Sequence, residues 1–299
     1  MKATLLQTAV QNGARRISMG LGFALTVTLL QLNATAVDVD LGTANNFAVL
    51  AGSTVTSTGN TVVNGDLGLY PGTSVTGFSP GIVNGTMHVA DAVAQQAQID
   101  LLAAYSHAAG LAPTGGTLTG QDLGGLTLTP GVYFFASSAQ LTGQLTLDAQ
   151  GLSDPVFVFQ IGSTLTTASG SSVITINDNS SLTPGISVFW QIGSSATLGT
   201  TTAFEGNILA GQSITLNTGA NVLDGRVLAL NAAVTLDDNT ITAPPAEVIG
   251  GSGGGGGGES VPDTGSTLLL LGFGVLGLLA LSRARGQSLV LAQNRRAIS

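Results

Sequence analysis

The sequence contains no cysteine, so disulfide bonds contribute nothing to the stability of this protein. Basic residues are also scarce, with 8 lysines and arginines against 16 aspartates and glutamates. All 16 carboxylates lie in residues 38–263, where Arg226 is the one basic residue and the net charge is −15. Nucleic-acid binding needs a basic surface that replaces the counterions of the phosphates. We therefore predict no nucleic-acid partner.

The chain repeats a short phrase in which a threonine stands between two small or aliphatic residues. The phrases begin at residues 126, 145, 163, 174, 196, 214 and 234. Their alternation has the two-residue period of a β-strand. A repeat of about 20 residues is typical of a solenoid, whose coils bury their apolar residues against one another. We therefore predict a parallel β-helix with threonine ladders spaced by about 4.8 Å. The leucines expected to point inward are Leu128, Leu147, Leu198, Leu216 and Leu236.

Glycines that follow a polar residue recur at a similar interval. Gly65 and Gly85 are 20 residues apart, and Gly206 and Gly225 are 19 residues apart. Asn-Gly and Asp-Gly pairs favour the positive φ angles of tight corners. We interpret these glycines as corners of the coils.

One segment breaks the β pattern and predicts a helix from Met87 to Ala109. It lacks proline and glycine, is rich in alanine and glutamine, and ends before Gly110 and Pro113. We expect the helix to lie along one side of the solenoid. The predicted apolar stripe consists of Val89, Val93, Ala97, Leu101 and Ala104, widened by Leu102 and Tyr105, with Ile99 outside it.

The two histidines, His88 and His107, are near opposite ends of the predicted helix. They are too far apart along a helix to share a metal ion. We interpret them as surface or packing residues, and we predict neither a metal site nor a cofactor.

The N-terminus has the pattern of a secretory signal peptide. Basic residues precede an apolar run over residues 17–32, and Ala34 and Ala36 provide the small residues of a cleavage site. We predict a signal peptide over residues 1–36 and export of the mature chain from Val37 onward. An uncleaved N-terminal anchor helix is the alternative.

The C-terminal region has the order of elements of a bacterial envelope sorting signal. A glycine-rich linker over residues 246–260 precedes an apolar run, Leu268–Leu281, and two arginines, Arg283 and Arg285. Between linker and apolar run stands the pentapeptide Val261-Pro262-Asp263-Thr264-Gly265. Residues 261–299 resemble the exosortase-type (PEP-CTERM-like, VPDSG) class, and the pentapeptide is similar to the sortase LPXTG motif.

The resemblance implies that an envelope transpeptidase of the exosortase or sortase type cuts near Thr264-Gly265. We predict that Leu268–Leu281 crosses the membrane at least transiently, with a cytoplasmic C-terminus. The expected location is the cell surface or the medium. A simple membrane anchor is the alternative.

Several longer phrases resemble those of the microbial ice-binding protein family. They lie at residues 41–50, 125–133, 188–193, 204–210 and 234–237 and follow the family's order over residues 38–243. The resemblance implies that residues 37–245 form one mainly β domain. Its expected fold is a right-handed parallel β-helix, triangular in section, with one α-helix packed along a face. It also implies that a flat, helix-free face binds ice.

The family's motif Thr-(Ala/Gly)-x-(Thr/Asn) occurs at residues 58–61, 114–117 and 218–221, and the threonines at 200–202 occupy the equivalent place one coil before residue 218. Threonine is stiff at χ1, so a ladder of threonines presents hydroxyl and methyl groups in a fixed pattern. We expect the ice-binding side chains to point to solvent. They are Thr58, Thr61, Thr200, Thr202, Thr218 and Asn221.

An exported or envelope-anchored ice-binding protein is therefore the predicted function. A β-helical lyase or hydrolase needs clustered carboxylates or bound Ca²⁺. The acidic residues of this chain are dispersed, and we expect Arg226 to pair with Asp224 or Glu205, so we predict no enzyme. A surface adhesin or structural envelope solenoid without ice activity is the alternative.

Overall fold

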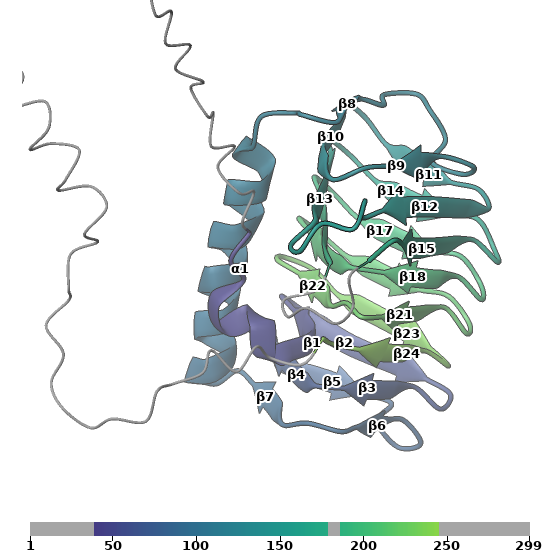
Figure 1. Cartoon of the computed structure of the whole chain (residues 1–299). Helices are drawn as coiled ribbons and strands as arrows, with labels where there is room; N and C mark the ends of the chain where they lie inside the picture. Colours follow the sequence, from purple (N-terminus) through teal and green to yellow (C-terminus); the bar gives the residue numbers. More distant parts are fainter. Residues whose placement is uncertain (1–38, 179–185, 245–299) are drawn as a thin grey trace, which may run out of the picture. The chain divides into compact units, whose positions relative to one another are not determined.

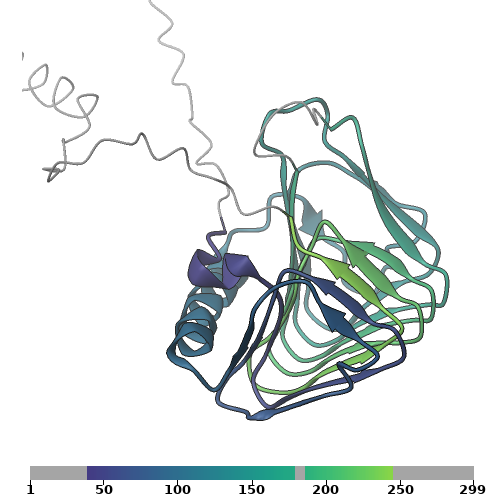
Figure 2. The same cartoon turned by 90° about the horizontal axis from the view of Figure 1, so that it is seen from below.

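The computed structural model describes residues 39–178 and 186–244. These residues form a β-helix whose three sides are parallel sheets, and its cross-section is triangular (Figure 2). The predicted signal peptide, linker and sorting segment lie outside the described residues. No helix in the described part of the chain is long and apolar enough to cross a membrane.

Each side of the triangle is one sheet, whose strands are named below in the order in which they lie side by side. Sheet A contains β7 (Met87–Val89), β4 (Asp66–Leu69), β1 (Phe47–Ala51), β22 (Val227–Ala229), β19 (Asn207–Ala210), β16 (Ser187–Ile192), β13 (Val156–Ile161), β10 (Gly131–Phe135) and β8 (Gly116–Thr117). Sheet B contains β11 (Ala139–Leu141), β14 (Leu165–Thr167), β17 (Ala196–Leu198), β20 (Ile214–Leu216), β23 (Val234–Asp237), β2 (Thr54–Thr58) and β5 (Ser74–Thr76). Sheet C contains β6 (Ile82–Val83), β3 (Val62–Asn64), β24 (Thr240–Thr242), β21 (Asn221–Leu223), β18 (Ala203–Glu205), β15 (Ser172–Ile176), β12 (Gln144–Asp148) and β9 (Thr127–Leu128).

The coils do not stack in sequence order. Strands β1, β2 and β3 of the first coil pair with β22, β23 and β24 of the last coil. The next strands, β4 to β7, form one end of the stack, and helix α1 (Ala92–Gly110) then runs along sheet A to the other end (Figure 1). From there the chain coils back, so the last coil lies inside the stack.

The interior of the solenoid is filled by inward-pointing apolar side chains. Leu147, Leu198, Leu216 and Leu236 are at most 1% exposed, and Leu128 packs partly buried against the same cluster. The prediction for these leucines is confirmed. An aromatic stack also runs through the coils, and its closest pair is Phe159 and Trp190, with ring centroids 3.9 Å apart.

The seven threonine phrases are not all equivalent. Those at 126 and 145 lie in sheet C, whereas those at 196, 214 and 234 lie in sheet B. In the other two phrases the register is shifted, because Thr166 rather than Thr164 pairs with Thr197, and Ile174 rather than Thr175 pairs with Thr146. The prediction of one equivalent repeat is wrong in these places, because a triplet pattern does not distinguish the sides of a triangle.

The predicted glycine corners join sheet C to sheet A. Gly65 and Gly206 have φ angles of 136° and 104°, which other residues rarely adopt. A Cβ atom on Gly225 would lie 2.1 Å from the carbonyl oxygen of Gly206 in the coil beside it. Glycine is therefore required at Gly65 and Gly206 for the backbone conformation, and at Gly225 for close stacking against the neighbouring coil.

The helix begins at Ala92, not at Met87 as the composition predicted. Residues 87–89 form β7, which pairs with β4. Ala90 then has a positive φ of 53°, and the side chain of Asp91 accepts a hydrogen bond of 2.9 Å from the backbone N–H of Ala94. This N-cap fixes the start of the helix, and propensity alone did not reveal it.

The face of α1 that packs on sheet A is lined by small residues. Its buried residues are Ala94, Ala97, Leu101, Ala104 and Ala108. The predicted stripe is correct at Ala97, Leu101 and Ala104, but Val93 and Leu102 are 47% and 55% exposed. Alanines dominate the buried face because larger residues of sheet A, such as Phe189, Leu209 and Leu228, fill the space between helix and sheet.

Arg226 does not form the predicted pair with Asp224 or Glu205. Its side chain is 3% exposed and donates to the carbonyl oxygen of Asn45 at 3.0 and 2.8 Å. It also donates to Oδ1 of Asn207 at 2.9 Å and to the carbonyl oxygen of Pro244 at 3.3 Å. Carbonyl and amide oxygens, rather than a carboxylate, thus accept the hydrogen bonds of this buried guanidinium. Burial lowers the pKa of Arg226 to about 10.

Glu205 lies at the same corner, and burial raises its pKa to about 7. Because the folded pKa lies above the ordinary value of 4.5, the folded state binds more protons than the unfolded state between these two pH values. The stability that the neutral carboxyl contributes is thus present below about pH 4.5 and is lost as the pH rises through about 7.

We predict that Glu205→Gln stabilises the fold at about pH 8 by about 1–2 kcal/mol and has little effect at about pH 4.5. Thermal unfolding across this pH range measures the effect. Asp148→Asn is a matched control of opposite sign, because hydrogen bonds from Asn177 and Gln150 lower the pKa of Asp148. A wild type and a Glu205→Gln variant with parallel pH profiles would contradict the assignment.

Candidate functional site

Two of the three sides of the solenoid carry no helix within residues 39–178 and 186–244. Helix α1 contacts strands of sheet A, and the short 3₁₀ helix η1 (Gly42–Asn46) packs against α1 and β1. Sheets B and C are therefore the candidate functional faces (Figure 1).

The outer face of sheet B presents threonine at six successive rungs. The register places these side chains directly above one another, and Gln140 of β11 continues the column at one end. In spatial order the column consists of Thr166, Thr197, Thr215, Thr235, Thr56 and Thr76. The ladder predicted from the phrases is therefore present on this sheet.

A second column, two residues before the first along the chain, is also rich in hydroxyl groups. It includes Thr54 and Ser74, which are register partners. Thr164 donates to Oγ of Ser138 at 2.8 Å, and Ser195 and Ser213 share a hydrogen bond of 3.0 Å. These two hydrogen bonds restrict the rotamers of the four side chains that form them.

The geometry of the two columns follows from the sheet. Rungs are about 4.8 Å apart, and alternate residues along a strand are about 6.7 Å apart. Neither column contains a charged side chain, although Asp237 follows Thr235 on the outer face at the end of β23. The outer face of sheet C carries Asp148, Glu205, Ile174 and Leu223. Sheet B is therefore the more regular of the two faces, with uncharged hydroxyls and methyls at repeated spacings.

The residues selected by the family motif lie beside these columns, at the end of β2 and in the corner between sheets B and C. Thr58 ends β2, and Thr200 and Thr218 are in exposed turns. Thr58 and Thr218 both donate to the carboxylate of Asp237, the former at 2.6 Å. These bonds lower the pKa of Asp237, so the corner carries a negative charge.

The expectation that all motif residues point to solvent is wrong for Thr61 and Thr202, which are 0% exposed. Thr202 shares a hydrogen bond of 2.8 Å with Thr167, and Thr61 donates to the carbonyl oxygen of Thr58 at 3.4 Å. Both stabilise the corner from within. Asn221 is partly buried and accepts a hydrogen bond of 2.8 Å from the N–H of Thr240.

Two of the motif matches, at residues 58–61 and 218–221, fall where β2 and β20 of sheet B end, and the third, at residues 114–117, overlaps β8 of sheet A. The signal for the flat column was present in the phrases at 196, 214 and 234. Only the register shows that Thr56, Thr76 and Thr166 continue the same column, because their local sequences differ.

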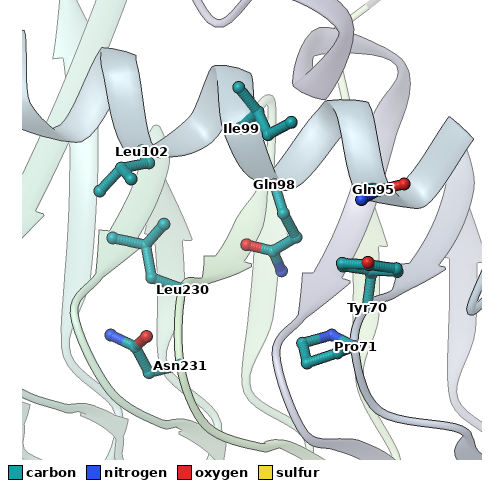
Figure 3. A pocket seen from close by; sticks show the side chains of 8 residues that line it. All are labelled: Tyr70, Pro71, Gln95, Gln98, Ile99, Leu102, Leu230 and Asn231. Carbon is teal, nitrogen blue, oxygen red and sulfur yellow. The ribbon is translucent and has the colours of Figure 1, made fainter. Parts of the chain in front are cut away.

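A shallow pocket of about 270 Å³ lies between α1 and the turns that follow β4 and β22 (Figure 3). Its lining residues are Tyr70, Pro71, Gln95, Gln98, Ile99, Leu102, Leu230 and Asn231. None of them is an acid, a histidine or a serine, so the pocket offers no catalytic pair.

The histidines have packing roles or lie at the surface. Nδ1 of His88 lies 2.8 Å from Oδ2 of Asp91, and its ring meets Phe47 edge-on at 5.7 Å. His107 is an exposed residue in the last turn of α1. Among the described residues, no three His, Asp or Glu side chains come together as a potential metal site.

Comparison with known sequences gives two family matches. Residues 49–242 match the family described as ice-binding-like, and residues 260–285 match the VPDSG-CTERM motif. The chain is 54% identical over 250 residues to an ice-binding protein of Nostoc sp. strain HG1, an alignment covering 82% of this chain and 87% of the relative.

Solved structures agree with this assignment. An ice-binding protein from an Antarctic biological consortium is 44% identical, with a TM-score of 0.64 over 81% of this chain and 96% of that protein. An ice-binding protein from the Antarctic ascomycete Antarctomyces psychrotrophicus is 40% identical, with a TM-score of 0.63 over 70% of this chain and 99% of that protein. This chain belongs to the ice-binding-like family, and a VPDSG-CTERM sorting motif follows its solenoid domain.

Proposed function

We propose that this protein binds ice through the outer face of sheet B. The observation that carries the proposal is the column of six threonines at successive rungs, flanked by a second hydroxyl-rich column. The family relationship supports it, because the relatives at 54% and 44% identity are ice-binding proteins.

Binding to ice depends on how a protein surface orders water. An ice-binding face has to be flat, rigid and patterned at distances comparable to those between water oxygens in ice. Stacked parallel strands supply the repeat, and β-branched threonine holds its rotamer. Charged groups hold their own hydration shells strongly, and the two columns of sheet B contain none.

We predict that Thr215→Tyr, near the middle of the column, removes most thermal hysteresis and ice recrystallisation inhibition. A tyrosine ring breaks the flat array and displaces the waters that neighbouring threonines order. The fold should lose at most about 0.5 kcal/mol, because the side chain points outward from β20. Thermal unfolding and ice-crystal shaping are measured on the same sample.

Two matched variants test the assignment of the face. Thr146→Tyr makes the same change on sheet C, and Thr218→Tyr makes it at the corner beside Asp237. Both should keep most of the activity. A loss with Thr218→Tyr but not with Thr215→Tyr would move the site to the corner, and an inactive wild type would favour the adhesin alternative.

Thr202→Tyr, by contrast, is expected to destabilise the domain by about 1–3 kcal/mol, because Thr202 is fully buried against Thr167. A loss of activity in this variant would report on folding and not on ice contact. Circular dichroism and thermal unfolding separate the two effects.

We further propose that the protein is exported through residues 1–36 and sorted through residues 261–299. The match of residues 260–285 to the VPDSG-CTERM motif supports sorting at the cell envelope. In this proposal the signal peptide is cleaved after Ala36, and Leu268–Leu281 crosses the membrane at least transiently. An exosortase- or sortase-type enzyme then cuts near Thr264. That the protein has no catalytic activity likewise stays a prediction.

We predict that deleting residues 262–265 leaves an uncut precursor in the membrane fraction. Deletion of four residues from the glycine-rich linker is the control, because it shortens the chain equally and keeps the motif. Immunoblots of membrane, envelope and medium fractions follow the product. Normal release of mature protein from the motif deletion would refute the sorting role.

A further inference from the structure

We propose that the domain is a mechanical anchor that carries tension between ice on sheet B and the cell envelope at its C-terminal end. The inference rests on the proposed function, because it takes sheet B as the ice-binding face. Two features of the domain support it: the place where the chain leaves the solenoid, and the bonds that hold the last coil.

The described chain ends at the corner opposite sheet B. Pro244 follows β24 of sheet C, and the N–H of Ala243 donates to the carbonyl oxygen of Asn64 at 3.1 Å. Asn64 and Gly65 form the corner at which sheet C turns into sheet A. In the triangular section this corner, between sheets C and A, lies opposite sheet B (Figure 2).

The chain between this corner and the sorting signal is short. Sixteen residues separate Pro244 from the sorting pentapeptide at Val261. Fully extended, they reach about 55 Å. The eight stacked strands of sheet C occupy about 38 Å along the axis, so the reach is of the order of the domain itself. The position of the exit therefore matters for which face an anchored domain presents outward.

The coil that the tether would pull is held on both sides. Strand β24 pairs with β21 on one side and with β3 on the other, over three residue pairs each. In a solenoid stacked in sequence order, the last coil would be the end and would peel off one bond at a time. In this protein the first coil covers the last coil, and a pull along β24 loads both ladders in shear.

Arg226 secures the exit itself. Its guanidinium bonds to the carbonyl oxygens of Asn45 and Pro244 and to the side chain of Asn207. One buried side chain thus joins the entrance of the first coil, the end of the last coil and the neighbouring coil that contains β19. Asn45 is in turn part of η1, where Asp100 of α1 accepts hydrogen bonds from Thr43 at 2.8 and 2.6 Å.

The outermost coil at the same end of the stack is a natural comparison. Strand β5 pairs with β2 alone among the described residues, and its residue Ser74 is exposed. A pull on this strand loads one ladder, starting from an edge. Force applied to it should therefore open the domain more readily than force applied through the tether.

Single-molecule pulling on the full chain tests the proposal. The chain has no native cysteine, so two introduced cysteines define the points of force. The pair Thr215→Cys and Ser252→Cys applies tension from sheet B to the linker, and the pair Thr215→Cys and Ser74→Cys applies it to the outermost coil. At equal constant force we expect the first pair to survive at least about tenfold longer, because two ladders and the Arg226 bonds must break.

Arg226→Lys keeps the charge and loses the fork of hydrogen bonds. It should shorten the lifetime under force of the Thr215→Cys and Ser252→Cys pair by about tenfold. The lifetime of the Thr215→Cys and Ser74→Cys pair should be nearly unchanged. Equal lifetimes for the two wild-type pairs would overturn the proposal, even if the lysine variant failed to fold. A lysine variant that shortens both lifetimes alike would show that Arg226 acts only on general stability.

Ice-binding assays on the wild type and on Arg226→Lys, both without the introduced cysteines, separate this inference from the proposed function. Arg226→Lys lies far from the threonine columns and should keep wild-type thermal hysteresis at low temperature. A wild type without thermal hysteresis would refute the proposed function, whereas the pulling experiment would still decide whether the exit resists tension.

Discussion

The parallel hydrogen-bonded ladders between coils are the interaction on which the rest of this structure depends. Each ladder sets the residue of one coil directly above its partner in the next, as from Thr197 to Thr215. A single-residue slip would turn the threonines inward and the leucines outward. The ladder therefore determines the core and the outer face together, and the regular surface of sheet B is a consequence of the register that buries Leu198 and Leu216.

The core replaces the disulfides that many exported proteins use. Apolar residues of successive coils stack as the backbone does, and the aromatic series from Tyr133 through Phe159 and Trp190 to Phe204 crosses three coils. Trp190 also donates its indole N–H to the carbonyl oxygen of Glu205 at 3.0 Å, so the largest core side chain leaves no unpaired donor. In the described residues, no buried side-chain nitrogen or oxygen lacks a hydrogen-bond partner.

The two outward columns of sheet B are uncharged, and the charged residues nearest to them and to the chain ends gather at two corners. Asp237 lies at the edge of sheet B, where Thr58 and Thr218 hold its carboxylate. Glu205, Asp224 and Arg226 lie at the opposite corner, where the burial of these groups makes stability depend on pH. Separating the two regions lets one corner hold the ends of the domain while the threonine columns stay uncharged and flat.

The sequence by itself determined the solenoid, its inward leucines and its glycine corners, because each depends on alternation and spacing along a single coil. It also indicated a helix, although the helix begins at Ala92, after the N-cap Asp91, and not at Met87 as predicted. Only the tertiary structure reveals the threonine column to which we assign ice binding, because Thr56, Thr76 and Thr166 join Thr215 through register between coils distant in sequence. The same holds for Arg226, whose partners at Asn45 and Pro244 meet because the first coil stacks on the last.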